Sequence, residues 1–252
     1  MNIHGIKNIL KIIGFIFIKP NDDALIRKIK KDAAHTDRSF WYGLRKYVVD
    51  AIYCHASPGT FETILLELDK IGGKENKRVL NLGGGNGQVS RIIEQLGFTV
   101  VNVDIELDKE DEKNIRFDLN SDNRLTVPPH SFDVVICQEI IEHIENPWKL
   151  LRFAKLYLKP SGILFLTTPN IQSRLSKVLF FVKGYFKWFE PRSLSFHINP
   201  LPVWEVELIA NKAGLTLTDC KGSGEYYFGR NKKRKRSVVL QKNETLIFIY
   251  QA

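Results

Sequence analysis

Hydrophobic and polar residues follow two alternating patterns from residue 77 onward, and these patterns predict strands and helices in turn. The segment KRVLNL (77–82) is a short apolar run that is typical of a buried strand. After a glycine-rich turn, Val89, Ile92, Ile93 and Leu96 recur at i, i+3, i+4 and i+7, the spacing of one helix face. The first unit is therefore a strand, a tight turn and a helix.

The same alternation continues to the end of the chain. Further strands are predicted for GFTVVNVDI, ending at Asp104, for KNIRFDLN, ending near Asp118, and for SFDVVICQEI, SGILFLTTPN, LTLTDC and ETLIFIYQA. One helix begins with Asn146 as N-cap and Pro147 in its first turn, and another opens on the Asn-Pro of NPLPVWEVELIANKAG. This order predicts an open α/β sheet of about seven strands, mostly parallel, with helices on both faces.

Two segments lie outside this alternation. Residues 1–72 are predicted to form a helical extension that packs on the α/β domain of residues 73–252. An aromatic and basic insert at about 170–198 interrupts the domain after the fifth strand. Its aromatic side chains could form a lid over an acceptor pocket, or they could simply belong to the core.

Charge and cysteine content indicate which partners and which cellular compartment to expect. The net charge is +9, and five cations stand together in NKKRKRS (231–237). With an apolar stripe at residues 6–17, this run predicts peripheral contact with an anionic membrane surface, on the inner face of the membrane, and less readily contact with nucleic acid. A solvated loop is the plainer interpretation of the basic run.

The apolar run at 12–18 is too short to span a bilayer. Cys54, Cys137 and Cys220 show no CxxC pairing, so a reducing, cytoplasmic compartment is expected.

The sequence VLNLGGGNGQVS (79–90) indicates a ligand-binding turn at the end of the first strand. Gly83, Gly85 and Gly87 give G-x-G-x-G, where backbone can approach a ligand closely. Asp104 ends the next strand, where a carboxylate can accept both hydrogens of a ribose diol, and Asp118 follows the third strand, well placed for an adenine amino group. Nucleotide phosphates or an uncharged part of a cofactor are both candidates for the turn itself.

The segments VLNLGGGNG, VVNVD, RFDLN, FDVVICQEIIEHIENP and LKPSGILFLTTPN resemble the class I S-adenosylmethionine-dependent methyltransferases, of the bacterial type 11/23 kind, over residues 77 to about 220. The resemblance implies a Rossmann-like fold and S-adenosyl-L-methionine as cofactor. The cofactor-binding residues that it implies are Gly83, Gly85 and Gly87 around the methionine part, Asp104 on the ribose, Asp118 and Leu119 beside the adenine, and Gln138 beside the cofactor. Asn81 stands where the family usually has an acid, so it keeps an acceptor oxygen but lacks the charge.

Candidate residues for acting on the methyl acceptor lie in QEIIEHIENP (138–147), which carries Glu139, Glu142 and His143 after the fourth strand. His197, in the insert, could reach the same place. Methyl transfer to a hydroxyl needs positioning and removal of a proton, so Glu142, His143 and His197 are the candidate catalytic residues, with no metal. The predicted activity is O-methylation of a glycan, a lipid-linked sugar or a related small acceptor.

Three alternatives remain open at this point. The E-x-x-E-H pattern with a later histidine also resembles the magnesium-binding set of small-RNA 2′-O-methyltransferases, since carboxylates and imidazoles can hold a divalent ion. Asn81 and the lack of an unambiguous base would suit a catalytically silent scaffold that binds S-adenosylmethionine. A nicotinamide-dependent dehydrogenase is the third alternative, and it would require tight binding of NADH.

Overall fold

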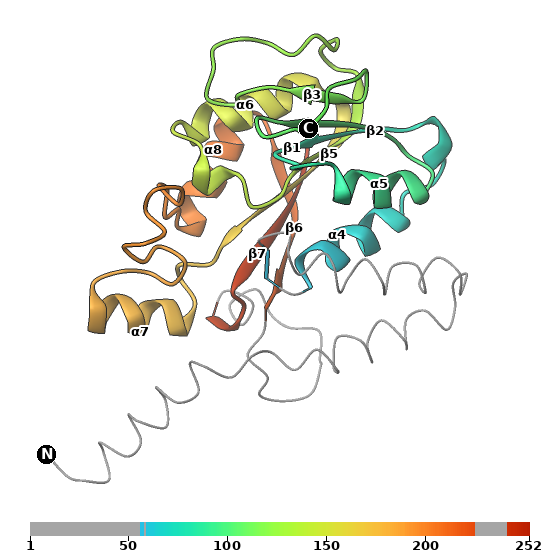
Figure 1. The fold of residues 1–252 in the computed structure, drawn as a ribbon. Helices are drawn as coiled ribbons and strands as arrows, with labels where there is room; N and C mark the ends of the chain where they lie inside the picture. Colours follow the sequence, from blue (N-terminus) through green and yellow to red (C-terminus); the bar gives the residue numbers. More distant parts are fainter. Residues whose placement is uncertain (1–55, 58, 225–240) are drawn as a thin grey trace, which may run out of the picture.

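A seven-stranded sheet forms the centre of the molecule (Figure 1). The computed structural model describes residues 56–57, 59–224 and 241–252. The strand order is β3-β2-β1-β4-β5-β7-β6, and the pairings are parallel except those of β7, which runs antiparallel to both β5 and β6. The strands are β1 (Arg78–Leu82), β2 (Thr99–Asp104), β3 (Asn114–Arg116), β4 (Phe132–Cys137), β5 (Leu158–Pro169), β6 (Thr216–Ser223) and β7 (Thr245–Gln251). The predicted open, mostly parallel α/β sheet is confirmed.

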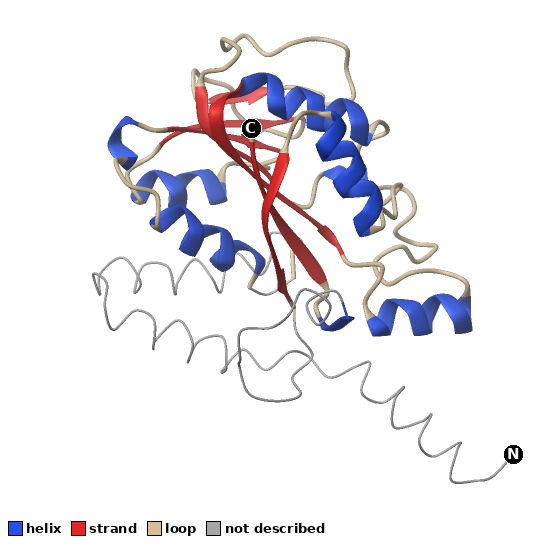
Figure 2. Cartoon of the chain, turned by 180° about the vertical axis from the view of Figure 1, so that it is seen from behind, coloured by secondary structure: helices blue, strands red, loops and turns tan. Residues whose placement is uncertain are grey.

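Helices cover both faces of this sheet, as Figures 1 and 2 show from opposite sides. The helices of the described residues are α4 (Thr60–Asp69), α5 (Gln88–Gln95), α6 (Pro147–Tyr157), α7 (Arg174–Lys183) and α8 (Val203–Lys212), with the 3-10 turns η2 (Lys74–Asn76) and η3 (Ile141–His143). Helices α4 and α5 lie on one face, and α6 and α8 lie on the other. In the described part of the chain, none of the helices combines the length and the apolar content that crossing a membrane requires.

Alternation along the strands separates two hydrophobic cores. In β1, Val79 faces the core beneath α4 and α5, whereas Leu80 and Leu82 face the core beneath α6 and α8. All three side chains have no exposed surface. A strand buried on both faces is expected of a parallel sheet covered by helices on either side, and it explains why KRVLNL is apolar almost throughout.

Several predicted element ends differ from the structure. The fourth strand, predicted over SFDVVICQEI, stops at Cys137, and two other ends were wrong for identifiable reasons. The third strand stops at Arg116, so Asp118 lies in the loop beyond it. Helix α8 begins at Val203 rather than at Asn199, because each residue before a proline avoids the helical region and the NPLP segment contains two prolines. By contrast, the predicted N-cap of α6 is confirmed, since the side chain of Asn146 accepts a hydrogen bond from Lys149 N.

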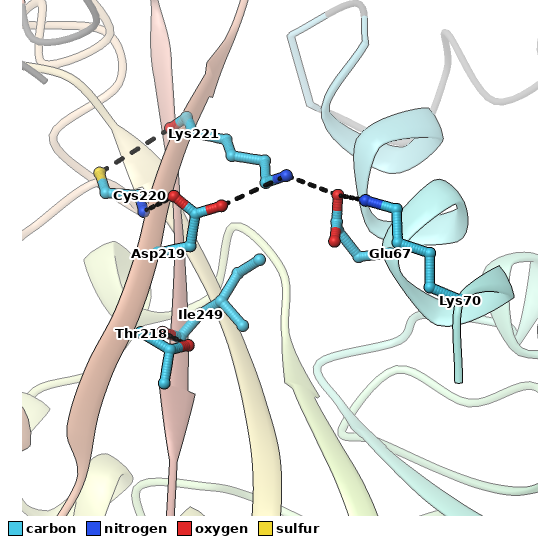
Figure 3. Close-up of polar contacts among 7 residues, drawn as sticks. All are labelled: Glu67, Lys70, Thr218, Asp219, Cys220, Lys221 and Ile249. Atoms are coloured by element: carbon cyan, nitrogen blue, oxygen red, sulfur yellow. Dashed lines mark hydrogen bonds and ion pairs between the residues drawn. The ribbon is translucent and has the colours of Figure 1, made fainter. Parts of the chain in front are cut away.

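Helix α4 is tied to the far end of the sheet by polar contacts as well as by its apolar face. Lys221 Nζ, on β6, lies 2.5 Å from Glu67 Oε1 and 3.3 Å from Asp219 Oδ2, and Lys70 also reaches Glu67 (Figure 3). Burial alone would raise the pKa of Glu67, but the hydrogen bonds from Lys221 and Lys70 outweigh it and lower that pKa. The ionised carboxylate therefore holds α4 against β6.

Several predictions concern residues outside this description. The apolar stripe at 6–17, most of the predicted extension over 1–72 and the basic run at 231–237 lie outside the described residues. The part of the extension that is described, α4, packs on the sheet.

Candidate active site

The glycine turn between β1 and α5 brings backbone close to two neighbouring strands. Gly83, Gly85 and Gly87 have φ values of 73°, 53° and 73°, a region that favours glycine. A Cβ at Gly83 would lie 2.7 Å from the side chain of Ile140, which follows β4, whereas a Cβ at Gly85 would meet nothing within 4 Å. The turn is thus packed against the β4 loop on one side and open on the other.

A buried hydrogen-bond network supports this turn from below. Asn102 Nδ2 donates to Gly85 O, so Asn102 Oδ1 accepts from Ser90 Oγ at 2.8 Å and from Asn81 Nδ2 at 3.3 Å. Asn81 Nδ2 also donates to Ser90 Oγ. Because its amide nitrogen is used in this way, Asn81 is oriented with its oxygen as the remaining polar atom.

The other predicted cofactor residues lie along the carboxyl edge of the sheet. Asp104 is half-buried, and its two carboxylate oxygens accept from Gly85 N and Glu106 N while keeping further acceptor capacity. Asp118 is exposed, and one of its oxygens accepts from Asn120 N. The side chain of Leu119 is buried in the core, which leaves its backbone as the part that can face a ligand. Gln138 Oε1 is buried without a hydrogen-bond partner, which suits a bound polar group.

The loop after β4 has an unusual backbone. Glu139 has a φ of 47°, which is uncommon for a residue with a side chain and recurs at functional sites. Thr167 of β5 holds this conformation, since its hydroxyl accepts from Glu139 N at 2.9 Å and donates to Glu139 Oε1 at 2.6 Å. The E-x-x-E-H segment is therefore not one helical turn, because only Ile141–His143 is helical.

The end of the insert lies against this loop and places His197 beside it. Ile198 N and Asn199 N both donate to Glu142 O, at 2.9 and 3.1 Å. The His143 and His197 rings lie 4.7 Å apart between centroids, and one ligand atom from each of Glu142, His143 and His197 lies within 4.8 Å of the others. The three predicted catalytic residues thus form one cluster, which we call the histidine cluster.

Each imidazole in the histidine cluster has a defined orientation. His143 Nδ1 faces Phe196 O at 2.9 Å, and His197 Nδ1 faces Trp188 O. A carbonyl only accepts, so these contacts favour the tautomer that carries its proton on Nδ1 and presents the lone pair of Nε2. Both side chains are half-buried, so the cluster is reachable by an acceptor.

The carboxyl groups beside the imidazoles resist ionisation. Burial raises the pKa of Glu139 to about 7. Burial raises the pKa of Glu142 well above its usual value, and the charge of Glu139 raises it further. Glu142 has no exposed surface, and the contacts with Thr168 and with its own backbone that favour the ionised form do not offset this burial. Such a buried carboxyl favours a bound proton or a nearby cation.

Sequence patterns did not identify four residues of this edge. Ser90, Asn102 and Thr167 carry the networks under the glycine turn and the β4 loop, and they looked like ordinary helix and strand positions. Ile105 follows Asp104 and is 56% exposed, so it offers an apolar surface beside that carboxylate. An apolar residue directly after a strand-ending acid was the available signal for Ile105.

A family model described as a methyltransferase domain matches residues 57–219, a span that runs from the start of α4 to β6 and contains both the glycine turn and the histidine cluster. The chain belongs to this methyltransferase family. S-adenosylmethionine is its cofactor, and the fold and the enzyme class that the sequence predicted are confirmed. The open side of the glycine turn, the unpartnered Gln138 oxygen and the exposed Ile105 fit a bound nucleoside of this kind.

Curated relatives of this methyltransferase are named for a specific reaction. The present chain is 24% identical over 179 residues to the ubiquinone biosynthesis O-methyltransferase of Aeromonas salmonicida, covering 65% of this chain and 75% of the relative. It is 27% identical over 183 residues to the enzyme of the same name from Neisseria meningitidis serogroup C, covering 65% and 77%.

Solved structures agree at the level of the fold. An S-adenosylmethionine-dependent methyltransferase from Mesorhizobium loti superposes with a TM-score of 0.53 at 16% identity, covering 77% of this chain and 99% of that chain. A Pyrococcus horikoshii protein gives a TM-score of 0.50 at 22% identity, covering 76% and 87%.

Proposed function

We propose that this methyltransferase methylates a hydroxyl oxygen of a glycan, a lipid-linked sugar or a related small acceptor. The observation that carries the proposal is the histidine cluster, where two imidazoles and a buried carboxyl meet after the β4 loop, whose Ile140 packs against the glycine turn. The relatives named ubiquinone biosynthesis O-methyltransferase support an oxygen acceptor.

The geometry of the carboxyl edge supports a proposed set of cofactor residues. S-adenosylmethionine supplies the methyl group in an activated form. The residues that we assign to holding it are Asn81, Gly83, Gly85 and Gly87 at the methionine part, Asp104 at the ribose, Ile105, Asp118 and Leu119 at the adenine, and Gln138 beside them.

The histidine cluster supplies the proton acceptor. A neutral imidazole with its proton on Nδ1 can take the hydroxyl proton of the acceptor at Nε2. The backbone carbonyls of Phe196 and Trp188 orient the two rings so that Nδ1 carries a proton. The raised pKa of Glu142 favours its protonated carboxyl, so this residue does not place a fixed negative charge beside the imidazoles.

The test is transfer of labelled methyl groups into separate lipid, polysaccharide and RNA extracts, with the product linkage identified chemically. His143→Asn and His197→Asn are each made, and the variant that removes the base is expected to lower kcat by about 10²–10⁴. His130→Asn is the matched control, because His130 also bonds a backbone carbonyl through Nδ1 but lies before β4, at the other edge of the sheet. Label on nitrogen, or full activity in both variants, would overturn the proposal.

A metal-assisted RNA 2′-O-methyltransferase is the second candidate. It is supported by the burial of the Glu142 carboxyl and by the 4.8 Å grouping of Glu142, His143 and His197, which is compact enough for one divalent ion. Label in RNA that disappears with a chelator, together with Mn²⁺ binding that Glu142→Gln abolishes in calorimetry, would select this candidate. Cofactor binding with no label in any extract would instead select the silent scaffold.

A further inference from the structure

Helix α7, in the insert, turns its apolar side to solvent. Val178, Phe181 and Val182 stand at i, i+3 and i+4, and they are 46%, 91% and 69% exposed. The opposite side of the helix carries Ser176 and Leu179, which are buried. A helix that packs on its own domain shows the reverse arrangement, with its apolar stripe inside.

This exposed stripe belongs to a larger apolar surface. The chain folds back on α7 through a stacked pair, Phe180 and Phe186, at 4.4 Å between centroids, and through Lys187 N, which donates to Ser176 Oγ. Other exposed apolar side chains follow in the insert: Trp188, Leu194, Phe196 and Ile198. We call this set, with Val178, Phe180, Phe181 and Val182, the α7 surface. Figures 1 and 2 show α7 beyond the end of β5, outside both helical layers.

The charges around the α7 surface have one dominant sign. Residues 174–198 contain five lysine and arginine side chains and a single acid, Glu190. Arg174, Lys177, Lys183 and Arg192 are exposed, whereas Lys187 is paired with Glu244. Lysine stems can lie along an apolar layer while their ammonium groups reach an anionic headgroup.

We propose that the α7 surface docks this methyltransferase on a lipid bilayer that contains anionic phospholipid. Aromatic and branched aliphatic side chains enter the boundary between headgroups and acyl chains, and the flanking cations bind the headgroups. Isolated exposed apolar residues are ordinary on protein surfaces, but a contiguous stripe rimmed by cations marks an interaction site. Nucleic acid would account for the cations and not for the solvent-facing Val178 and Val182.

The α7 surface includes residues next to the histidine cluster, so docking would bring the bilayer close to the proposed catalytic residues. Phe196 and Ile198 flank His197 in sequence, and the Phe196 ring stacks against His143 at 6.1 Å. Exposed apolar side chains thus lie both on α7 and directly beside the cluster. An acceptor anchored in the bilayer would reach the cluster past these side chains, a consequence that rests on the proposed function, whereas docking itself does not.

The experiment measures partitioning of the full-length chain onto vesicles of phosphatidylglycerol and phosphatidylethanolamine, against vesicles of phosphatidylcholine alone. The double variant Phe181→Ser/Val182→Ser is expected to partition about tenfold less onto the anionic vesicles. Lys177→Glu/Lys183→Glu should lose the preference for anionic lipid and its salt dependence. The matched control is Trp204→Ser/Leu208→Ser, which removes two exposed apolar side chains from α8 beside Glu205 and Glu207, and it should partition normally.

Hydrogen–deuterium exchange locates the contact, since another part of the chain could also bind vesicles. Peptides covering residues 174–198 should become protected when anionic vesicles are added, and those covering 203–212 should not. Unchanged partitioning with unchanged exchange in 174–198 would overturn the proposal. It would also be overturned if the serine variants altered only the oligomeric state or the stability, which would assign the stripe to a second copy or to another part of the chain. Methyl transfer to a detergent-dispersed acceptor is measured separately, so loss of docking and loss of catalysis are distinguishable.

Discussion

At position 81, the surrounding hydrogen bonds suit an asparagine better than the acid that is usual in the family. Restoring the usual acid by Asn81→Asp would place a carboxylate oxygen 3.3 Å from Asn102 Oδ1, where the amide nitrogen now donates. Asn102 cannot turn round without losing its bond to Gly85 O. We therefore expect Asn81→Asp to lower the unfolding free energy by about 1–3 kcal/mol, the cost of an unsatisfied buried group, without tighter binding of S-adenosylmethionine.

Denaturant unfolding and calorimetric titration with the cofactor measure both quantities. Asn86→Asp is the matched control, because it adds the same charge to the same turn at an exposed position whose Oδ1 only accepts, from Asp108 N. The control should unfold like the parent. An Asn81→Asp variant that is stable and binds the cofactor more tightly would show that the network adapts and that charge decides affinity.

Glu142 predicts how stability changes with pH. Its pKa in the folded chain is raised above the ordinary value of 4.5 by burial and by the charge of Glu139. Since the folded chain holds this proton more tightly than the unfolded chain, the resulting stabilisation is complete below about pH 4.5 and is lost as pH rises through the raised pKa. We expect Glu142→Gln, which does not titrate, to exceed the parent in Tm by more at pH 8 than at pH 6.

Thermal unfolding of both proteins across this range is the measurement. A divalent ion would reverse the comparison, because it binds the ionised carboxylate and would raise the Tm of the parent most at pH 8. A gap between Glu142→Gln and the parent that does not widen with pH in metal-free buffer would contradict the raised pKa.

The loop between β4 and η3 is an element whose shape depends on one hydroxyl from another strand. Thr167 both donates to and accepts from Glu139, whose φ of 47° requires support. Thr167→Val should lower stability by about 1–3 kcal/mol and lower kcat/KM as well, whereas Thr167→Ser should keep most of both. Thr218→Val is the control on β6, where the hydroxyl donates to Ile249 O far from this loop. Loss of stability alone would mean that the loop shape does not matter to the reaction.

Elements were predictable from sequence wherever the pattern was local. Short apolar runs located the strands, the i, i+3, i+4 and i+7 spacing located α5, and Asn146-Pro147 located the start of α6. The errors had both tertiary and local causes. The fourth strand stops at Cys137, before Glu139, whose backbone binds Thr167, whereas α8 starts at Val203 because of the prolines before it, and Val203 N donates to Gln172 Oε1 across the insert.

The site was predictable to the extent that the topology of the whole molecule places strand ends together. A parallel sheet brings the loops after β1, β2 and β4 to one edge, so Gly83, Asp104 and Gln138 could be expected to lie along it. The meeting of His143 with His197 could only be suggested, because it depends on hydrogen bonds from Ile198 and Asn199 to Glu142 O across the insert. Asn102 was missed because a buried amide has no sequence signal of its own.

At the largest scale, stability and cofactor binding should separate, because the core under α4 lies on a face of the sheet and the site lies on its edge. Leu68 in α4 has no exposed surface and packs in the core with Val79 and Ile93. Leu68→Ala should lower the unfolding free energy by about 2–5 kcal/mol, since it leaves a cavity, whereas Leu66→Ala, at a partly buried position, should cost less.

Below the unfolding transition, calorimetry should give the parent affinity for S-adenosylmethionine in both leucine variants. The glycine turn is held by Asn102, Asp104 and Val103 O, and none of these contacts passes through α4. Loss of affinity in Leu68→Ala at full stability would show instead that α4 shapes the turn through β1. The same pair of measurements would then make α4 part of the binding site rather than support for the sheet.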